Sequence, residues 1–189
     1  MSSSVIMSSS LIIRTRQCVK RSLFVIASVA LATVCISSIG QAATLRILAL
    51  GASNAAGKGV ATEQAWPARL QQMLRAKGYD AVVTVNAVNG LTSSAILSGV
   101  DAAVAPGTQV VVFDVGMAND RKRNVSPSET QANKEQIAAH IRAHGAKAIF
   151  APYRGAPRQA DGHHLSAEGH AEVAARLVPM VIAAAGGRR

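Results

Sequence analysis

Cysteine and aromatic residues are scarce in this chain of 189 residues, which has two Cys, one Trp, two Tyr and three Phe. Both cysteines, Cys18 and Cys35, lie in an amino-terminal segment that we predict to be removed. The rest of the chain then has no thiol for a disulfide, a thiolate metal site or a cysteine nucleophile, and a packed core must supply its stability. With so few rings there is no stacking platform for single strands, and no nucleic-acid partner is expected.

Acidic residues are absent before Glu63, and this end of the chain has the pattern of a secretory signal peptide. The basic residues of that pattern are Arg14, Arg16, Lys20 and Arg21. An apolar run over residues 23–36 follows, too short for a comfortable membrane span, and small residues at 40–42 suit a signal peptidase. We predict that residues 1–42 are a cleaved signal peptide and that the protein is periplasmic or secreted. An uncleaved anchor is the main alternative, and the valine before Cys35 argues against a lipoprotein anchor.

Residues 43–189 are enough for one domain with a substantial core, and no linker or repeat divides them. The whole chain has a net charge of +10, and it stays moderately basic without the predicted signal peptide. Such a charge favours a weak, long-range attraction to anionic surfaces, but it does not identify a binding or catalytic site. Its dense cluster, Arg121-Lys122-Arg123, is typical of a solvated basic face.

Strand and helix patterns alternate along this domain. Apolar, β-branched runs predict strands at residues 45–50, 81–86, 109–115 and 146–151. Apolar stripes and capping residues predict helices at 62–78, 91–100 and 126–144 and a last one capped by Ser166. This alternation predicts an α/β domain with a mostly parallel sheet and helices on both faces.

Ser53 lies just after the first predicted strand, where open α/β sheets place their ligands. Small residues surround it, so its hydroxyl is a candidate nucleophile. A turn or helix-cap role is the plainer alternative. A phosphate-binding loop is not favoured, because five residues separate Gly51 from Gly57 and Gly59 follows Lys58 where Ser or Thr is needed.

Further candidate residues follow the later strands. The amides of Ser53 and Gly90 and the side chain of Asn119 could hold a developing oxyanion. His164 could accept the serine proton and Asp161 could orient it, with His163 as the alternative base. We expect His140 and His144 to face solvent and His170 to be structural. A zinc site built from Asp161, His163, His164 and His170 fits no standard ligand spacing.

These residues resemble the sequence blocks of the SGNH (GDSL-type) hydrolase superfamily over essentially all of residues 43–189. The matching blocks are Gly51-Ala52-Ser53 with Gly57 and Gly59, Asn86 with Gly90 and Thr92, Asn119-Asp120, and Asp161-Gly162-His163-His164-Leu165-Ser166 with Gly169-His170. The resemblance is closest to small exported bacterial esterases, thioesterases and lysophospholipase-like enzymes. It implies a flavodoxin-like three-layer α/β/α sandwich and a carboxylic ester hydrolase. It also implies a triad of Ser53, Asp161 and His164, an oxyanion hole of Ser53, Gly90 and Asn119, and no metal or organic cofactor.

The sequence departs from the family pattern in three places. Ala52 stands where the family usually has aspartate, so a hydrogen bond of the nucleophile loop must be missing or replaced. Met117 and Ala118 both separate Gly116 from Asn119, where one residue is usual, and the block ending at Gly90 is one residue shorter. A rearranged oxyanion hole would lower the rate, by about two to three powers of ten.

Three hypotheses follow from these observations. The first is a hydrolase of small-molecule or lipid esters that forms an acyl-Ser53 intermediate. The second is a non-catalytic small-molecule or carbohydrate-binding protein on the same scaffold, favoured by Ala52 and the altered Asn119 loop. The third is a basic envelope protein whose salt-sensitive binding to anionic polymers or lipid surfaces would survive Ser53→Ala.

Overall fold

The computed structural model describes residues 44–187, and the predicted signal peptide lies outside them. Within this range four parallel strands form one sheet in the order β2-β1-β3-β4. The strands are β1 (Leu45–Gly51), β2 (Ala81–Ala87), β3 (Val110–Phe113) and β4 (Lys147–Phe150). The predicted parallel sheet is confirmed. The strand order reverses at β1, because β2 lies on one side of it and β3 on the other.

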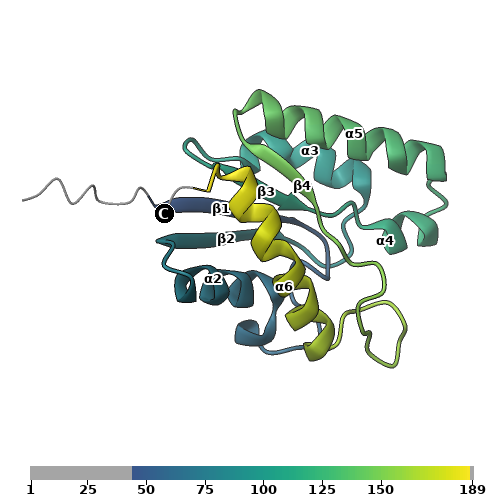
Figure 1. The fold of residues 1–189 in the computed structure, drawn as a ribbon. Helices are drawn as coiled ribbons and strands as arrows, with labels where there is room; N and C mark the ends of the chain where they lie inside the picture. The colour runs from purple at the N-terminus through teal and green to yellow at the C-terminus, as the bar shows by residue number, and fades with distance from the viewer. Residues whose placement is uncertain (1–43, 188–189) are drawn as a thin grey trace, which may run out of the picture. The chain divides into compact units, whose positions relative to one another are not determined.

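Helices cover both faces of the sheet, as the alternating pattern predicts. The helical elements are the 3₁₀ turn η1 (Thr62–Gln64), α2 (Trp66–Ala76), α3 (Ser93–Ala103), α4 (Met117–Lys122), α5 (Pro127–Ala143) and α6 (Ala167–Ala184). Figure 1 shows α2 and α6 on one face and α3 and α5 on the other. The domain is therefore a three-layer α/β/α sandwich.

The two central strands divide their side chains between two cores, because successive residues of a strand point to opposite faces. Toward α2 and α6 point Ile47, Ala49, Val110 and Val112. Toward α3 and α5 point Leu48, Leu50, Val111 and Phe113. Burial on both faces explains why these strands are apolar throughout rather than alternating.

Side-chain caps fix where the two longest helices begin. The Ser126 hydroxyl accepts a hydrogen bond from the Glu129 N–H (3.1 Å), and Ser166 does the same for Gly169 (3.2 Å). Both starts confirm the prediction. The predicted cap at Thr62 is wrong: α2 begins at Trp66, because Pro67 lacks an N–H and fits only the first turn of a helix.

His140 and His144 do not simply face solvent but join α5 to α3. The Nδ1 atom of His140 and the Nε2 atom of His144 each lie 3.0 Å from Asp101 Oδ1. Hydrogen bonds from His140 and then His144 hold the pKa of Asp101 below its usual range.

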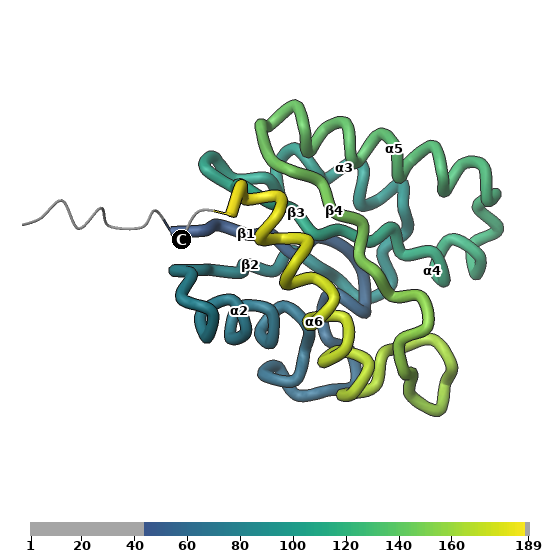
Figure 2. The backbone as a smooth tube through the Cα atoms, viewed as in Figure 1, coloured from purple at the N-terminus to yellow at the C-terminus, as the bar shows by residue number. Residues whose placement is uncertain are grey.

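The loops that leave the carboxyl ends of the strands gather at one edge of the sheet. The last turn of α6 lies at the opposite end of the domain, the end at which β1 begins (Figure 2). Among residues 44–187, no helix is both long and apolar enough to cross a membrane.

Candidate active site

Ser53 follows β1 and lines a cavity of about 660 Å³. Its carbonyl accepts a hydrogen bond from the Lys58 N–H (3.0 Å), which closes the loop after the strand. The side chain is half-buried, and neither its hydroxyl nor its N–H has a hydrogen-bond partner within residues 44–187. A hydroxyl and an amide are thus both free at the cavity wall.

Asp161 and His164 contact each other directly. The Asp161 Oδ2 atom is hydrogen-bonded to His164 Nδ1, and Oδ1 accepts from the backbone N–H groups of His163 (2.8 Å) and His164 (2.9 Å). These bonds, that of the His164 ring first, hold the pKa of Asp161 far below its usual range. The carboxylate therefore stays ionised and fixes the ring so that Nε2 is its free nitrogen.

Two amide side chains tie the serine loop to the histidine loop. Asn54 Oδ1 accepts from the Leu165 N–H (2.9 Å), so the residues next to Ser53 and His164 are bonded to each other. Gln159 Nε2 donates to the carbonyls of Lys58 and Leu165, both at 2.8 Å. The two loops are held together in this way, although no hydrogen bond joins Ser53 to His164 among the described residues.

Gly90 and Asn119 come together beside the serine loop. Asn119 Nδ2 donates to the carbonyl of Leu91 (2.8 Å), the residue after Gly90. This bond occupies one of the two amide hydrogens of Asn119, and the side chain lines the cavity. The N–H of Gly90 has no hydrogen-bond partner within the described part of the chain, although Gly90 is not itself in the cavity wall.

Helix α4 occupies the segment that we predict as a loop. Gly116 has a left-handed conformation (φ 59°) at its start, which places Asn119 in the first turn. Buried Asp120 anchors the helix by accepting from the Ser93 N–H (2.8 Å) and the Thr130 hydroxyl (2.7 Å). The additional residue before Asn119 therefore lies in a helical turn that Asp120 joins to α3 and α5 by hydrogen bonds.

Gly116→Ala should be costly because a Cβ atom there would lie 2.1 Å from the Leu91 carbonyl oxygen. We expect the free energy of unfolding to fall by about 2 to 4 kcal/mol from the left-handed strain and the collision together. Gly145→Ala is the matched control, since Gly145 is also left-handed (φ +80°) but has no atom within 4 Å of the added Cβ. Urea denaturation of both variants measures the difference, and equal losses would rule out the close approach to Leu91.

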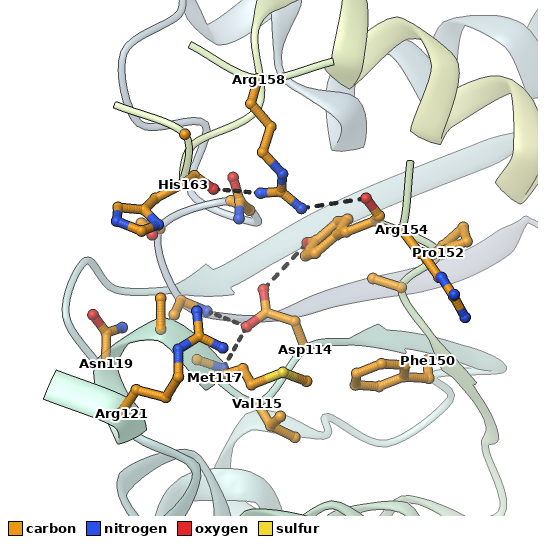
Figure 3. A pocket seen from close by; sticks show the side chains of 18 residues that line it. Asp114, Val115, Met117, Asn119, Arg121, Phe150, Pro152, Arg154, Arg158 and His163 are labelled. Carbon is orange, nitrogen blue, oxygen red and sulfur yellow. Dashed lines mark hydrogen bonds between the residues drawn. The ribbon is translucent and has the colours of Figure 1, made fainter. Parts of the chain in front are cut away.

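Buried Asp114 holds the backbone at Ala52, just before the candidate nucleophile. Its Oδ1 atom accepts from the N–H groups of Ala52 (3.2 Å) and Gly116 (2.9 Å), and the Tyr153 hydroxyl donates to Oδ2 (3.2 Å; Figure 3). Burial raises the pKa of Asp114, partly offset by these bonds, and burial with the nearby carboxylate raises the pKa of Tyr153. One carboxyl group thus connects the start of the Ser53 loop to the start of α4.

Comparison with known proteins identifies the family of this domain. The model of the GDSL-like lipase/acylhydrolase family matches residues 49–185. The chain belongs to this family. Esterase TesA of Pseudomonas aeruginosa is 36% identical over 111 residues, which are 58% of this chain and 55% of that relative, so the match spans about half of the relative's length.

Two solved structures share this fold. The crystal structure of TesA superimposes with a TM-score of 0.64 at 25% identity, over 75% of this chain and 99% of that one. The SGNH-hydrolase family esterase AlinE4 has a TM-score of 0.52 at 22% identity, over 77% of this chain and 74% of that one. The GDSL-like fold is therefore present across the described residues.

His170 is buried in α6 of this GDSL-like domain, which agrees with a structural role. Its Nδ1 atom accepts from the Trp66 N–H (3.1 Å), so the ring is neutral with its proton on Nε2, which has no partner. Burial, and then the charge of Arg69, lowers the pKa of His170 from its usual 6.5 to about 4. Among residues 44–187, no three His, Cys, Asp or Glu side chains are grouped as a metal ion would require.

His170 should make the fold less stable as the pH falls. Between pH 6.5 and about 4, His170 is protonated in the unfolded chain but stays neutral in the folded protein. We therefore expect His170 to reduce the free energy of unfolding by about 1.4 kcal/mol per pH unit across this window, with no further loss below it. His170→Asn keeps an acceptor for Trp66 but cannot titrate, so urea unfolding at several pH values should show a flatter slope for this variant. An unchanged slope would contradict the assignment.

Proposed function

We propose that this protein is a serine hydrolase that cleaves carboxylic esters through an acyl-Ser53 intermediate. The observation that carries the proposal is the hydrogen bond from the Leu165 N–H to Asn54 Oδ1. This bond joins the loop of the Asp161–His164 pair to the loop of Ser53, whose hydroxyl has no partner among the described residues. Membership of the GDSL-like family supports ester hydrolysis in general. The individual roles below are assigned from this chain's own contacts.

In the first half of the reaction, His164 Nε2 removes the Ser53 proton as Oγ attacks the ester carbonyl carbon. The N–H groups of Ser53 and Gly90 and the free amide hydrogen of Asn119 stabilise the tetrahedral oxyanion. Collapse of this intermediate breaks the bond to the alkoxy oxygen, which leaves with the proton from His164. Ionised Asp161 stabilises the imidazolium throughout.

In the second half, water replaces the alcohol. His164 accepts a proton from the water as its oxygen attacks the acyl carbon, and the second oxyanion occupies the same donors. Breaking the bond to Ser53 Oγ releases the carboxylic acid and returns the proton to serine. No step uses a metal or an organic cofactor.

The contacts around Ala52 and Asn119 weigh against the binding-protein hypothesis. Asp114 supplies an acceptor to the Ala52 N–H, and α4 carries Asn119 to the residue beside Gly90. These contacts bear on two of the three departures from the family pattern, and they support a working oxyanion hole.

Turnover and covalent labelling test the hydrolase proposal together. Protein covering residues 43–189 should hydrolyse 4-nitrophenyl butyrate and lose this activity on reaction with a fluorophosphonate. Peptide mass spectrometry should place the phosphonyl group on Ser53. Absence of both turnover and labelling would overturn the proposal and favour the binding protein.

We also propose that the protein is exported, on the strength of the signal pattern in residues 1–42. The full chain, expressed in a bacterium with a periplasm, should yield a soluble periplasmic or secreted product whose first residue lies near position 43. A product that keeps residues 1–42 would contradict cleavage and favour the anchored alternative.

A further inference from the structure

Arginine side chains surround the cavity beside Ser53 without acidic partners. Three arginines are part of its wall: Arg121, Arg154 and Arg158. The ion pairs within residues 44–187 involve none of them. An arginine at a cavity wall that forms no ion pair with a carboxylate is available to an anionic ligand.

Two of these arginines are directed at the cavity. Arg158 donates to the carbonyl oxygens of Tyr153 and His163, which fix its position and leave its positive charge uncompensated. Arg121 lies on α4, and its guanidinium group makes no hydrogen bond with another described residue. Figure 3 shows both guanidinium groups reaching toward the middle of the cavity from different sides, while Arg154 points away.

The nearest carboxyl groups are already engaged. Asp114 is the acidic residue of the cavity wall, and its oxygens accept bonds from Ala52, Gly116 and Tyr153. Asp161 is bonded to His164 and to two backbone N–H groups. Neither forms an ion pair with an arginine of the wall, and three arginines stand there against one acidic residue, so the cavity favours a negatively charged ligand.

The remaining wall is suited to a hydrocarbon chain. Val115, Met117, Phe150 and Pro152 supply apolar surface. A smaller cavity of about 280 Å³ shares Val115, Met117 and Arg121 with the first and continues along α5. The site therefore combines apolar walls with positively charged side chains, as an anionic amphiphile requires.

We propose that this site selects esters carrying a second, negatively charged group, a carboxylate or phosphate, which Arg121 and Arg158 bind while Ser53 attacks the ester. This inference rests on the proposed hydrolase function and names its substrate class. The charge can belong to the acyl chain or to the alcohol. Arg121, whose guanidinium has no partner among the described residues, can bind an oxyanion with two parallel hydrogen bonds, and Arg158 adds its charge and its remaining N–H groups.

Matched esters test the proposal on the protein of residues 43–189. For the acyl half, the mono-4-nitrophenyl ester of pimelic acid is compared with 4-nitrophenyl heptanoate, which lacks the terminal carboxylate. For the alcohol half, 4-(butanoyloxy)benzoate is compared with its neutral methyl ester. We expect one charged ester to exceed its neutral partner in kcat/KM by about tenfold or more, since hydrogen bonds to charged groups are the stronger ones. The pair that shows the preference identifies which half of the substrate carries the charge.

Arginine variants link the preference to the cavity. Arg121→Gln and Arg158→Gln should each lower the charged-to-neutral ratio of kcat/KM by roughly tenfold. Arg158→Lys keeps a charge and guards against a folding defect at the carbonyls of Tyr153 and His163. Arg123→Gln is the matched control, because Arg123 is exposed at the end of α4 and outside the cavity wall. Its ratio should equal that of the unmodified protein.

The outcomes separate this inference from the hydrolase proposal. Neutral and charged esters cleaved equally well would overturn the inference and leave the hydrolase intact. If no ester is cleaved, the hydrolase proposal fails, and binding of hexyl phosphate to Ser53→Ala, measured by calorimetry, decides the inference alone. Binding that Arg121→Gln weakens about tenfold supports the anion site, and no binding refutes it.

Discussion

Ser53→Ala should lower kcat/KM for a simple ester by about four powers of ten or more. Alanine leaves no atom to form the acyl bond, so only the oxyanion donors and the cavity remain to accelerate attack by water. The Ser53 hydroxyl makes no hydrogen bond with another described residue, and the substitution should therefore leave the unfolding midpoint unchanged. Initial rates with 4-nitrophenyl butyrate, taken beside a thermal unfolding curve, measure both effects.

Matched variants show whether the loss belongs to the proposed triad. His164→Ala should cost a comparable factor, and the double variant should cost no more than either single one, since the residues act as a unit. Ser98→Ala is the control: Ser98 is an exposed serine of α3 that donates to Ala95. His163→Ala should retain activity, because the Asp161 carboxylate orients the ring of His164. If Ser53→Ala still turned over ester normally, or His163→Ala alone abolished turnover, the assignment of these roles would be wrong.

Local patterns were sufficient to predict the layers of this fold. The buried strands are continuous apolar runs, and Ser126 and Ser166 cap their helices through atoms only three residues away. These signals act within one segment, so they can be interpreted without knowing which segments meet. The Asp161–His164 pair was predictable for the same reason, since both residues lie in one turn.

Contacts between distant segments were not predictable from such patterns. Asn54 and Leu165 are 111 positions apart, and nothing in either segment indicates that they are bonded. Helix α4 forms because Asp120 is anchored by Ser93 and Thr130, which belong to other helices. Asp114 stands out in the sequence as a charged residue near the end of the apolar strand 109–115. Its hydrogen-bond partner Ala52, however, is 62 positions away. These contacts and the helix α4 depend on tertiary packing, which overrides the local propensity of each segment.

Asp114→Ala is the second change with a large expected effect. It removes the acceptor of the Ala52 and Gly116 N–H groups and of the Tyr153 hydroxyl, all in a buried site. Each unsatisfied group costs about 1 to 3 kcal/mol, so the loss of the acceptor for all three should lower the free energy of unfolding by roughly 3 to 9 kcal/mol. The rate should fall as well, because Asp114 holds the backbone before Ser53 to the start of the helix that carries Asn119. Urea unfolding and kcat/KM, taken well below the unfolding midpoint, measure the two losses.

Asp114→Asn distinguishes the hydrogen bonds from the charge. The amide oxygen can still accept from Ala52 and Gly116, while the buried carboxyl group is gone. We therefore expect Asn to recover most of the stability and activity that Ala loses, because burial already disfavours the ionised form of this carboxyl and raises its pKa. If Asn were as damaging as Ala, the charge itself would be required. If Ala were harmless, the serine loop would depend on other contacts, and Asp114 would not replace the aspartate that this chain lacks at position 52.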